Sequence, residues 1–233
     1  MIARIVPPAP MELTDLGVVP AATGLREERE ILASVERVQC AGVHAGDTPS
    51  GAGGGEHLLI WEAAHPTVVL PRNGSADAWA YVDACAARGV PILRRESGGG
   101  AVVLGPGCLN FALILSLDAR PALADVAGSY ETLLGAVVNA LAIPAVTIQS
   151  TDLALGNLKF AGHAQRRLRN TLLHHGTILY GFDLDLIDAV LPEPPQHPAW
   201  RGSRQHREFI TNVPLHRADL MARFQRLSRA HGT

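Results

Sequence analysis

Short apolar runs separated by turn residues predict several β-strands in this chain. The runs at 57–61 (HLLIW), 67–70 (TVVL) and 101–104 (AVVL) are bounded by Gly, Pro, Asn or charged residues, which is typical of strands. A longer run at 109–117 follows the turn GPG, and its spacing indicates antiparallel pairing with 101–104, because no crossover helix fits between them. Further strands are predicted over PILRR, VTIQ, LKFAGHAQ and TLLHHGTIL.

Other segments show apolar residues every three or four positions, which predicts helices. The first helix is expected over residues 25–40, with the charged run REERE on its solvent-facing side. Ser75 is placed to cap a helix that extends to about residue 87. The remaining helices are predicted at about 123–141, 184–191 and 215–230. Together the elements predict an α+β fold, a mostly antiparallel sheet flanked by helices laid on one side.

Composition bounds the domain organisation and the possible partners. The 233 residues, 47% of them hydrophobic, are enough for one large core. Residues 1–24 are interpreted as an irregular N-terminal arm and 42–55, which end in DTPSGAGGG, as a flexible surface loop. The net charge of −2 argues against nucleic acid or an anionic membrane as partner.

The sequence also bears on location. No apolar run reaches the roughly 18 residues that a transmembrane helix needs, and the N-terminus lacks the apolar core of a signal peptide. The cysteines Cys40, Cys85 and Cys108 are odd in number and form no CxxC pair. This pattern favours reduced thiols and a cytoplasmic protein.

The segment RRESGGGAVVLGPG, at 94–107, is the first candidate for chemistry. Three consecutive glycines allow positive φ and let main-chain N–H groups approach a ligand closely. Of the two arginines that precede them, one can reach into a pocket beside the glycines, where its planar fork suits a carboxylate or phosphate. The alternative is a bend whose glycines serve geometry alone. The segment has neither Walker A nor Rossmann spacing.

The segment from 151 to 179 is the second candidate. Lys159 lies in an otherwise apolar strand, so it either reaches the sheet edge or points into a pocket, where it can stabilise phosphoryl-transfer charge. Asp152 can hold Mg²⁺ against a phosphate or merely cap a turn. His174 and His175 are adjacent and therefore face opposite sides of their strand, so only one can line a pocket.

The two segments together resemble the lipoate–protein ligase A family, within the biotin/lipoate ligase superfamily. The matching motifs are RRESGGGAV at 94–102, LNFALI at 109–114, TDL at 151–153, KFAGHAQ at 159–165 and HHGTIL at 174–179. WEAAHPTVVLPRN at 61–73 is similar to the family's first hairpin, and RQHREFITNV at 204–213 to a later family stretch. The motifs occur in the family's order over roughly residues 25–215.

This resemblance implies a fold and a site. The fold would be the class II synthetase-like catalytic domain, here residues 25–233, with no large C-terminal accessory domain. Lys159 would be the catalytic lysine, while Asp152 stays the candidate Mg²⁺ ligand that its residue type suggests. Residues implied to bind the substrate or adenylate are Arg95, Ser97, Gly98, Gly99, Gly100, Ala101, Val102, Val103, Asn110, Gly162, His163, Ala164, His175, Gly176 and Thr177.

The resemblance also implies an activity. The protein would use ATP and Mg²⁺ to convert lipoate to lipoyl-AMP and then transfer the lipoyl group to a carrier lysine. The carrier would be a lipoyl domain, the H protein of glycine cleavage or a specialised lipoate-carrying protein. Because few residues follow the catalytic domain, activation either needs a separate accessory chain or proceeds without one. The sequence leaves the choice between lipoate and octanoate open.

Other readings remain at this point. One is an octanoyl or lipoyl transferase that uses a preformed activated donor, and another is a non-catalytic lipoate-binding module. A transferase with a cysteine thioester is disfavoured, because 145–158 hold no cysteine and Cys108 is interpreted as a small buried thiol. A biotin ligase is disfavoured because RRESGGGA replaces its basic adenylate loop. Thr151 stands where the family has Asn, and His163 stands where many members have Ser.

Overall fold

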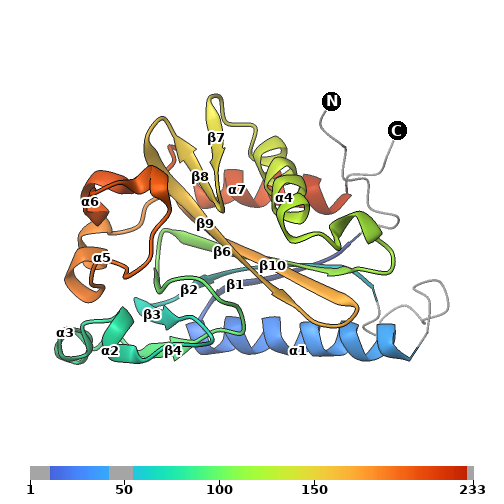
Figure 1. Cartoon of the computed structure of the whole chain (residues 1–233), viewed down its shortest axis with the longest axis horizontal. Coiled ribbons are helices and arrows are strands. Elements are labelled where there is room, and N and C mark those ends of the chain that lie inside the picture. Colours follow the sequence, from blue (N-terminus) through green and yellow to red (C-terminus); the bar gives the residue numbers. More distant parts are fainter. Residues whose placement is uncertain (1–10, 42–54, 230–233) are drawn as a thin grey trace.

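The computed structural model describes residues 11–41 and 55–229, whose strands form two sheets (Figure 1). In their order across the large sheet, the strands are β1 (Glu12–Val19), β2 (His57–Ala63), β6 (Cys108–Ser116), β10 (Thr171–Leu179), β9 (Leu158–Arg167), β8 (Asp152–Leu155) and β7 (Val146–Gln149). The small sheet has the order β4 (Ile92–Arg94), β3 (Thr67–Leu70) and β5 (Val102–Leu104). Only the pairs β1–β2 and β3–β4 are parallel, so the mostly antiparallel sheet is confirmed for the described residues.

Helices cover both faces of the large sheet, not one face as predicted. The α-helices are α1 (Ala21–Cys40), α2 (Ala76–Trp79), α3 (Val82–Ala87), α4 (Val126–Leu141), α5 (Leu184–Val190), α6 (His206–Phe209) and α7 (Arg217–Arg229). Two short 3₁₀ helices lie at Pro121–Leu123 and Ala199–Arg201. In Figure 1, α1 and the small sheet lie below the large sheet, whereas α4 and α7 lie above it. None of the described helices is both long and apolar enough to cross a bilayer.

The central strands alternate between two cores, which explains the two helical layers. Leu59 and Trp61 on β2 pack with the core under α1 and the small sheet. Leu58 and Ile60 on the same strand pack with the core under α4 and α7. Because successive side chains of a strand point to opposite faces, a strand that is apolar throughout must be covered on both sides. Helix α1 lies so close to β2 that a Cβ on Gly24 would be 2.3 Å from the Trp61 ring.

The predicted pairing of 101–104 with 109–117 is wrong. β5 pairs with β3 in the small sheet, whereas β6 pairs with β2 and β10 in the large one. The expected hairpin of 61–73 is absent for the same reason, since β2 and β3 lie in different sheets. Short spacing shows only that two strands are close in sequence. Here the chain passes from one sheet to the other at the turn 105–107, so neighbouring strands find other partners.

Two further predictions need correction, and one lies outside the described residues. The segment 1–24, expected to be an irregular arm, contains β1 and the start of α1 at Ala21. The sequence showed no sign of β1, because its hydrogen-bond partners lie in β2, far away in the sequence. The helix expected from Ser75 is split into α2 and α3, since Tyr81 donates its N–H to the Val190 carbonyl. The loop predicted at 42–55 falls almost entirely outside the described residues.

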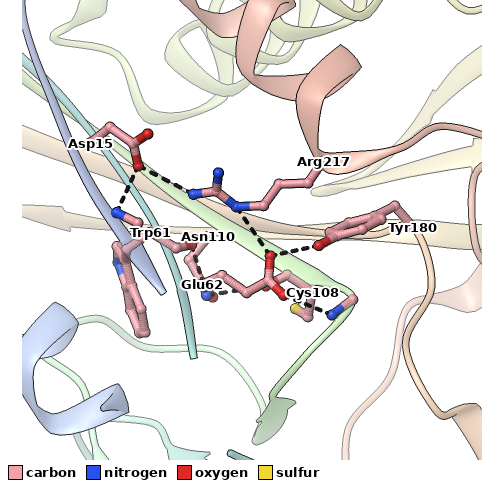
Figure 2. A network of polar contacts seen from close by, with 9 residues as sticks. Asp15, Trp61, Glu62, Cys108, Asn110, Tyr180 and Arg217 are labelled. Carbon is pink, nitrogen blue, oxygen red and sulfur yellow. Dashed lines mark hydrogen bonds and ion pairs between the residues drawn. The ribbon is translucent and has the colours of Figure 1, made fainter. Parts of the chain in front are cut away.

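A buried carboxylate ties the C-terminal helix to the turn between β5 and β6 (Figure 2). Glu62 accepts hydrogen bonds from the Tyr180 hydroxyl at 2.6 Å and from the Gly107 N–H at 3.0 Å. Arg217 of α7 lies 3.5 Å from the same carboxylate and 3.3 Å from Asp15 of β1. Burial and the bond to Glu62 raise the pKa of Tyr180, so the phenol stays a proton donor. The contacts fix the turn that leads into β6.

Candidate functional site

A cavity of about 470 Å³ lies on the α1 side of the large sheet. It is lined by residues of α1, the small sheet, β6, β9 and β10, and by the segment 191–210. The predicted site residues that line it are Arg95, Gly99, Gly100, Ala101, Val102, Val103, Asn110, Asp152, Lys159, Gly162, His163, Ala164, His175, Gly176 and Thr177. Ser97 and Gly98 are not among the lining residues, which differs from their predicted role as direct contacts.

The register of the large sheet brings distant motifs into one row. Thr177 of β10 lies opposite Asn110 of β6 on one side and Gly162 of β9 on the other. Gly162 in turn lies opposite Asp152 of β8. Four strands thus place these residues side by side, although they span 110–177 in the sequence. Ala164, opposite His175, adds a second small residue to the floor of the cavity.

Lys159 reaches across this floor. Its Nζ lies 2.6 Å from Oδ1 of Asp152, which is almost fully buried, while the lysine side chain is 29% exposed. A Cβ on Gly162 would be 2.9 Å from that Nζ and 3.0 Å from Cε, so the lysine stem lies directly on the glycine. A register shift in β8 between Leu153 and Ala154 accompanies this arrangement. Lys159 is the single lysine of the sequence, and the other 19 Lys or Arg residues are all arginines.

Arg95 holds the triple-glycine segment from inside. Its guanidinium donates to the Ser97 hydroxyl at 2.9 Å and to the Val69 carbonyl at 3.3 Å. It also donates to the carbonyls of Gly98 at 2.5 Å and Gly100 at 2.8 Å. Burial lowers the pKa of Arg95 to about 10, partly offset by the nearby Glu28 carboxylate, so the group stays charged at neutral pH. Most of the five donors of this arginine are therefore occupied by its own chain.

This hold on the carbonyls orients the amides of the loop. The C=O of one residue and the N–H of the next lie in one plane and point in opposite directions. With the Gly98 and Gly100 carbonyls turned to Arg95, the N–H groups of Gly99 and Ala101 point away from it. Both residues line the cavity. Free N–H groups in a row form an anion-binding concavity, so the loop can receive a phosphate or carboxylate oxygen.

Glu28 joins this site, although its position in REERE placed it on the solvent side. It is buried, and its Oε1 lies 2.9 Å from Nδ1 of His175. The other ring nitrogen of His175 lies 2.6 Å from the Ser97 hydroxyl. The prediction for Glu28 is wrong because the residue follows Gly24 by four positions and precedes Leu32 by four, which puts it on the buried stripe of α1. That spacing was the available sequence evidence.

The two histidines of β10 separate as expected from a strand. His175 lines the cavity, whereas His174 packs on the α4 side against Tyr130 and stacks on His163 with a centroid distance of 5.4 Å. Burial lowers the pKa of His163 to about 3 and the pKa of His174 well below its ordinary value. Both rings are therefore neutral. His163 covers Gly176, where a Cβ would be 2.3 Å from the ring.

Sequence reasoning did not anticipate one wall of the cavity. Trp61 and Trp79 line it, and Trp79 packs against Gly100. The segment 191–210 adds a Pro-rich wall that is attached to β9, since Ile210 forms a bridge with Lys159. Nothing in the sequence around Trp61 or Trp79 distinguished these residues from ordinary core tryptophans. Their place in the site follows from how the two sheets meet.

The cysteines take no part in the cavity lining. Cys85 and Cys108 are buried, and Cys40 lies at the end of α1. Burial raises the pKa of Cys108, and the nearby Glu62 raises it further. A nucleophilic cysteine needs an accessible thiolate. The interpretation of Cys108 as a small buried thiol therefore agrees with the structure.

Comparison with known proteins identifies relatives of the chain. The family "Lipoyl protein ligase A/B catalytic domain" matches residues 34–222. A curated relative, lipoate–protein ligase 1 of Staphylococcus aureus, is 26% identical over 164 residues, which cover 68% of this chain and 48% of the relative. The chain spans about half the length of the curated relatives that it matches.

Solved structures show the same fold. A bi-partite lipoate protein ligase from Thermoplasma acidophilum superposes with a TM-score of 0.71 at 22% identity, covering 94% of this chain and 82% of the other. A lipoate–protein ligase A bound with ATP gives a TM-score of 0.69 at 23% identity, covering 94% and 84%. The expected class II synthetase-like fold is thereby confirmed. Since the family match extends over most of its length, the chain belongs to the lipoyl protein ligase A/B catalytic domain family.

Proposed function

We propose that this protein activates lipoate with ATP to lipoyl-AMP and transfers the lipoyl group to a lysine of a carrier domain. One observation carries the proposal. The single lysine of the chain and the triple-glycine loop line the same cavity, so one acyl-phosphate group can touch both. Relatives of the same fold include a ligase bound with ATP and a bi-partite ligase studied with a lipoyl domain, which agrees with these substrates.

The charges of the cavity suit the activation step. When a carboxylate attacks the α-phosphorus of ATP, two anions come together and pyrophosphate leaves. The Lys159 ammonium and the N–H groups of Gly99 and Ala101 can stabilise that negative charge in a partly enclosed site. Asp152 and Lys159 neutralise each other in the absence of substrates. A phosphate can take over the ammonium, and a cation can take over the carboxylate.

We assign Mg²⁺ to Asp152. Mg²⁺ is commonly bound by one or two carboxylates together with substrate phosphates. Asp152 fits this pattern, because it lines the cavity and its Oδ1 contacts the flexible end of Lys159, which can move aside. The described residues contain no cluster of three or more metal-ligating side chains, so the phosphates would complete the coordination. The ion would supply charge neutralisation at the phosphates.

The apolar lining supports an acyl substrate. Leu25, Val69 and Leu179 also line the cavity, and an alkyl chain gains free energy when it leaves water for such apolar surface. Transfer then needs the amine of the carrier lysine to reach the activated carbonyl while AMP is retained. We propose a cytoplasmic reaction, in agreement with the three free thiols. Acyl transfer through a cysteine thioester is disfavoured, since no cysteine lines the cavity.

The proposal is tested by intact mass. The protein is incubated with ATP, Mg²⁺, lipoate and an apo lipoyl domain, and the mass of the domain is followed. Modification that requires ATP supports the ligase. Modification only when lipoyl-AMP is supplied would assign activation to a separate accessory chain, and modification only from an octanoyl thioester would indicate a transferase. If the domain stays unmodified in every arm although the protein binds lipoate, the protein is a non-catalytic lipoate-binding module.

Lys159 gives the sharpest variant. Lys159→Ala should remove lipoyl-AMP formation without unfolding the chain, because the side chain is partly exposed and its loss leaves Asp152 beside an open cavity. Lys159→Arg keeps the charge but presents a broader planar group, so it should restore little activity. Normal adenylate formation by Lys159→Ala would exclude Lys159 from the mechanism.

A further inference from the structure

A continuous chain of polar contacts links α1 to the triple-glycine loop. Glu28 contacts His175 Nδ1 at 2.9 Å, and His175 Nε2 contacts the Ser97 hydroxyl at 2.6 Å. Arg95 Nε then donates to the same hydroxyl at 2.9 Å. The links come from three distant parts of the sequence, and Glu28, Ser97 and His175 are all buried. Neither Glu28 nor Ser97 takes part in the proposed charge stabilisation by Lys159 and the loop amides.

One arrangement of protons satisfies every donor and acceptor of these contacts. Arg95 Nε can only donate, and an ionised Glu28 can only accept. With a neutral ring, His175 donates from Nδ1 to Glu28 and accepts at Nε2 from the Ser97 O–H. Ser97 then accepts from Arg95. In this arrangement every group is satisfied, and the Ser97 hydroxyl favours His175 Nε2 at 2.6 Å over the Gly98 carbonyl at 3.5 Å.

The set Ser97, His175 and Glu28 has the order of a nucleophilic triad, but Ser97 is not placed to attack a substrate. Its exposed fraction is 0%, and it does not line the cavity that holds the other site residues. Its oxygen already contacts both His175 and Arg95. An acyl carbonyl therefore cannot approach it. The geometry excludes nucleophilic attack and leaves a role in holding Arg95.

We infer that Glu28 is a positioning residue, which acts through His175 and Ser97 to fix Arg95 and, with it, the anion-binding loop. Arg95 contacts the Gly98 and Gly100 carbonyls, so the N–H groups of Gly99 and Ala101, two residues that line the cavity, point away from Arg95. The glycines have little conformational preference of their own, and Gly99 has φ +90°. Their orientation therefore depends on an external clamp. The inference rests on the proposed function for its effect on catalysis.

The kinetic test uses Glu28→Gln and Ser97→Ala, with Glu30→Gln as the matched control. Glu30 lies two residues further along α1 and is 59% exposed, so its variant changes the same charge outside the network. Glu28→Gln and Ser97→Ala should each lower kcat of adenylate formation by about tenfold or more, with KM for ATP nearly unchanged, because misplaced loop donors weaken transition-state stabilisation. The double variant should be no slower than the slower single one, since both interrupt one chain.

Further readouts separate this inference from the proposed function. Long-range ¹H–¹⁵N spectra of the intact protein should show His175 protonated at Nδ1 and not at Nε2, and Glu28→Gln should change this pattern whether or not the protein is a ligase. A fluorophosphonate should not label Ser97. Additive kinetic effects, a proton on His175 Nε2, or labelling of Ser97 would each overturn the inference. If the wild type is inactive but gives the expected spectra, the proposed ligase activity is refuted, while the positioning of Arg95 by Glu28, His175 and Ser97 still stands.

Discussion

The glycine beneath Lys159 offers a test of how closely the lysine must be placed. In Gly162→Ala the new Cβ would lie 2.9 Å from Nζ and 3.0 Å from Cε of Lys159. Carbon atoms in contact are normally about 3.5–4.0 Å apart, so the end of the lysine must move by roughly 0.5–1 Å. A displacement of about 1 Å at a reacting centre can lower a rate by about a hundredfold. We therefore expect adenylate formation to fall between tenfold and a hundredfold.

The same substitution should leave folding almost unchanged. The atoms that must move belong to the far end of a flexible side chain that is 29% exposed, so the contact with Asp152 lengthens but is not lost, and the cost stays within about 1 kcal/mol. Replacing a glycine that does not need a positive φ stabilises a protein by about 0.4–1 kcal/mol through the unfolded state. The two effects offset each other. Urea denaturation should give nearly the wild-type free energy of unfolding.

The assay is pyrophosphate release with lipoate and ATP, supported by carrier modification from supplied lipoyl-AMP. Gly181→Ala is the control, because a Cβ there meets no heavy atom within 4 Å. In a Lys159→Ala background, Gly162→Ala should have no further effect if it acts by displacing the lysine. A wild-type rate for Gly162→Ala would refute the reasoning. So would an equal loss in both backgrounds, which would show that the methyl group blocks the substrate directly.

Three other predictions concern buried groups. Tyr180→Phe removes a donor from buried Glu62 and should cost about 1–3 kcal/mol in urea unfolding, whereas Tyr81→Phe, at an exposed ring, should cost little. Burial lowers the pKa of His163 from 6.5 in the unfolded chain to about 3. The contribution of the neutral ring to the free energy of unfolding should therefore be fully present above pH 6.5 and decline as the pH falls toward 3. His163→Gln should flatten that decline in unfolding curves between pH 7 and 4, and an unchanged slope would contradict it. Cys108→Ala should still modify the carrier by intact mass, and complete loss in a folded variant would revive the thioester route.

Local sequence patterns located the candidate site of this protein. Three successive glycines between strands, a lysine in an apolar strand and an adjacent pair of histidines are visible without any structure, because each depends on backbone freedom, charge or alternation along a strand. Most of the predicted site residues line one cavity for that reason. The helices at 126–141 and 217–229 were likewise predictable, since their apolar spacing is local.

The tertiary structure alone decided which groups meet. Glu28 looked like one of several surface charges until the packing of α1 on Trp61 buried it against His175. The partners of β5 and β6 depended on two sheets that the spacing of the chain does not distinguish. Hydrogen bonds between strands and the burial of a helix face are formed across long sequence separations. A single sequence reveals which residues are suited to a site, but only the register of the folded sheets places them within bonding distance.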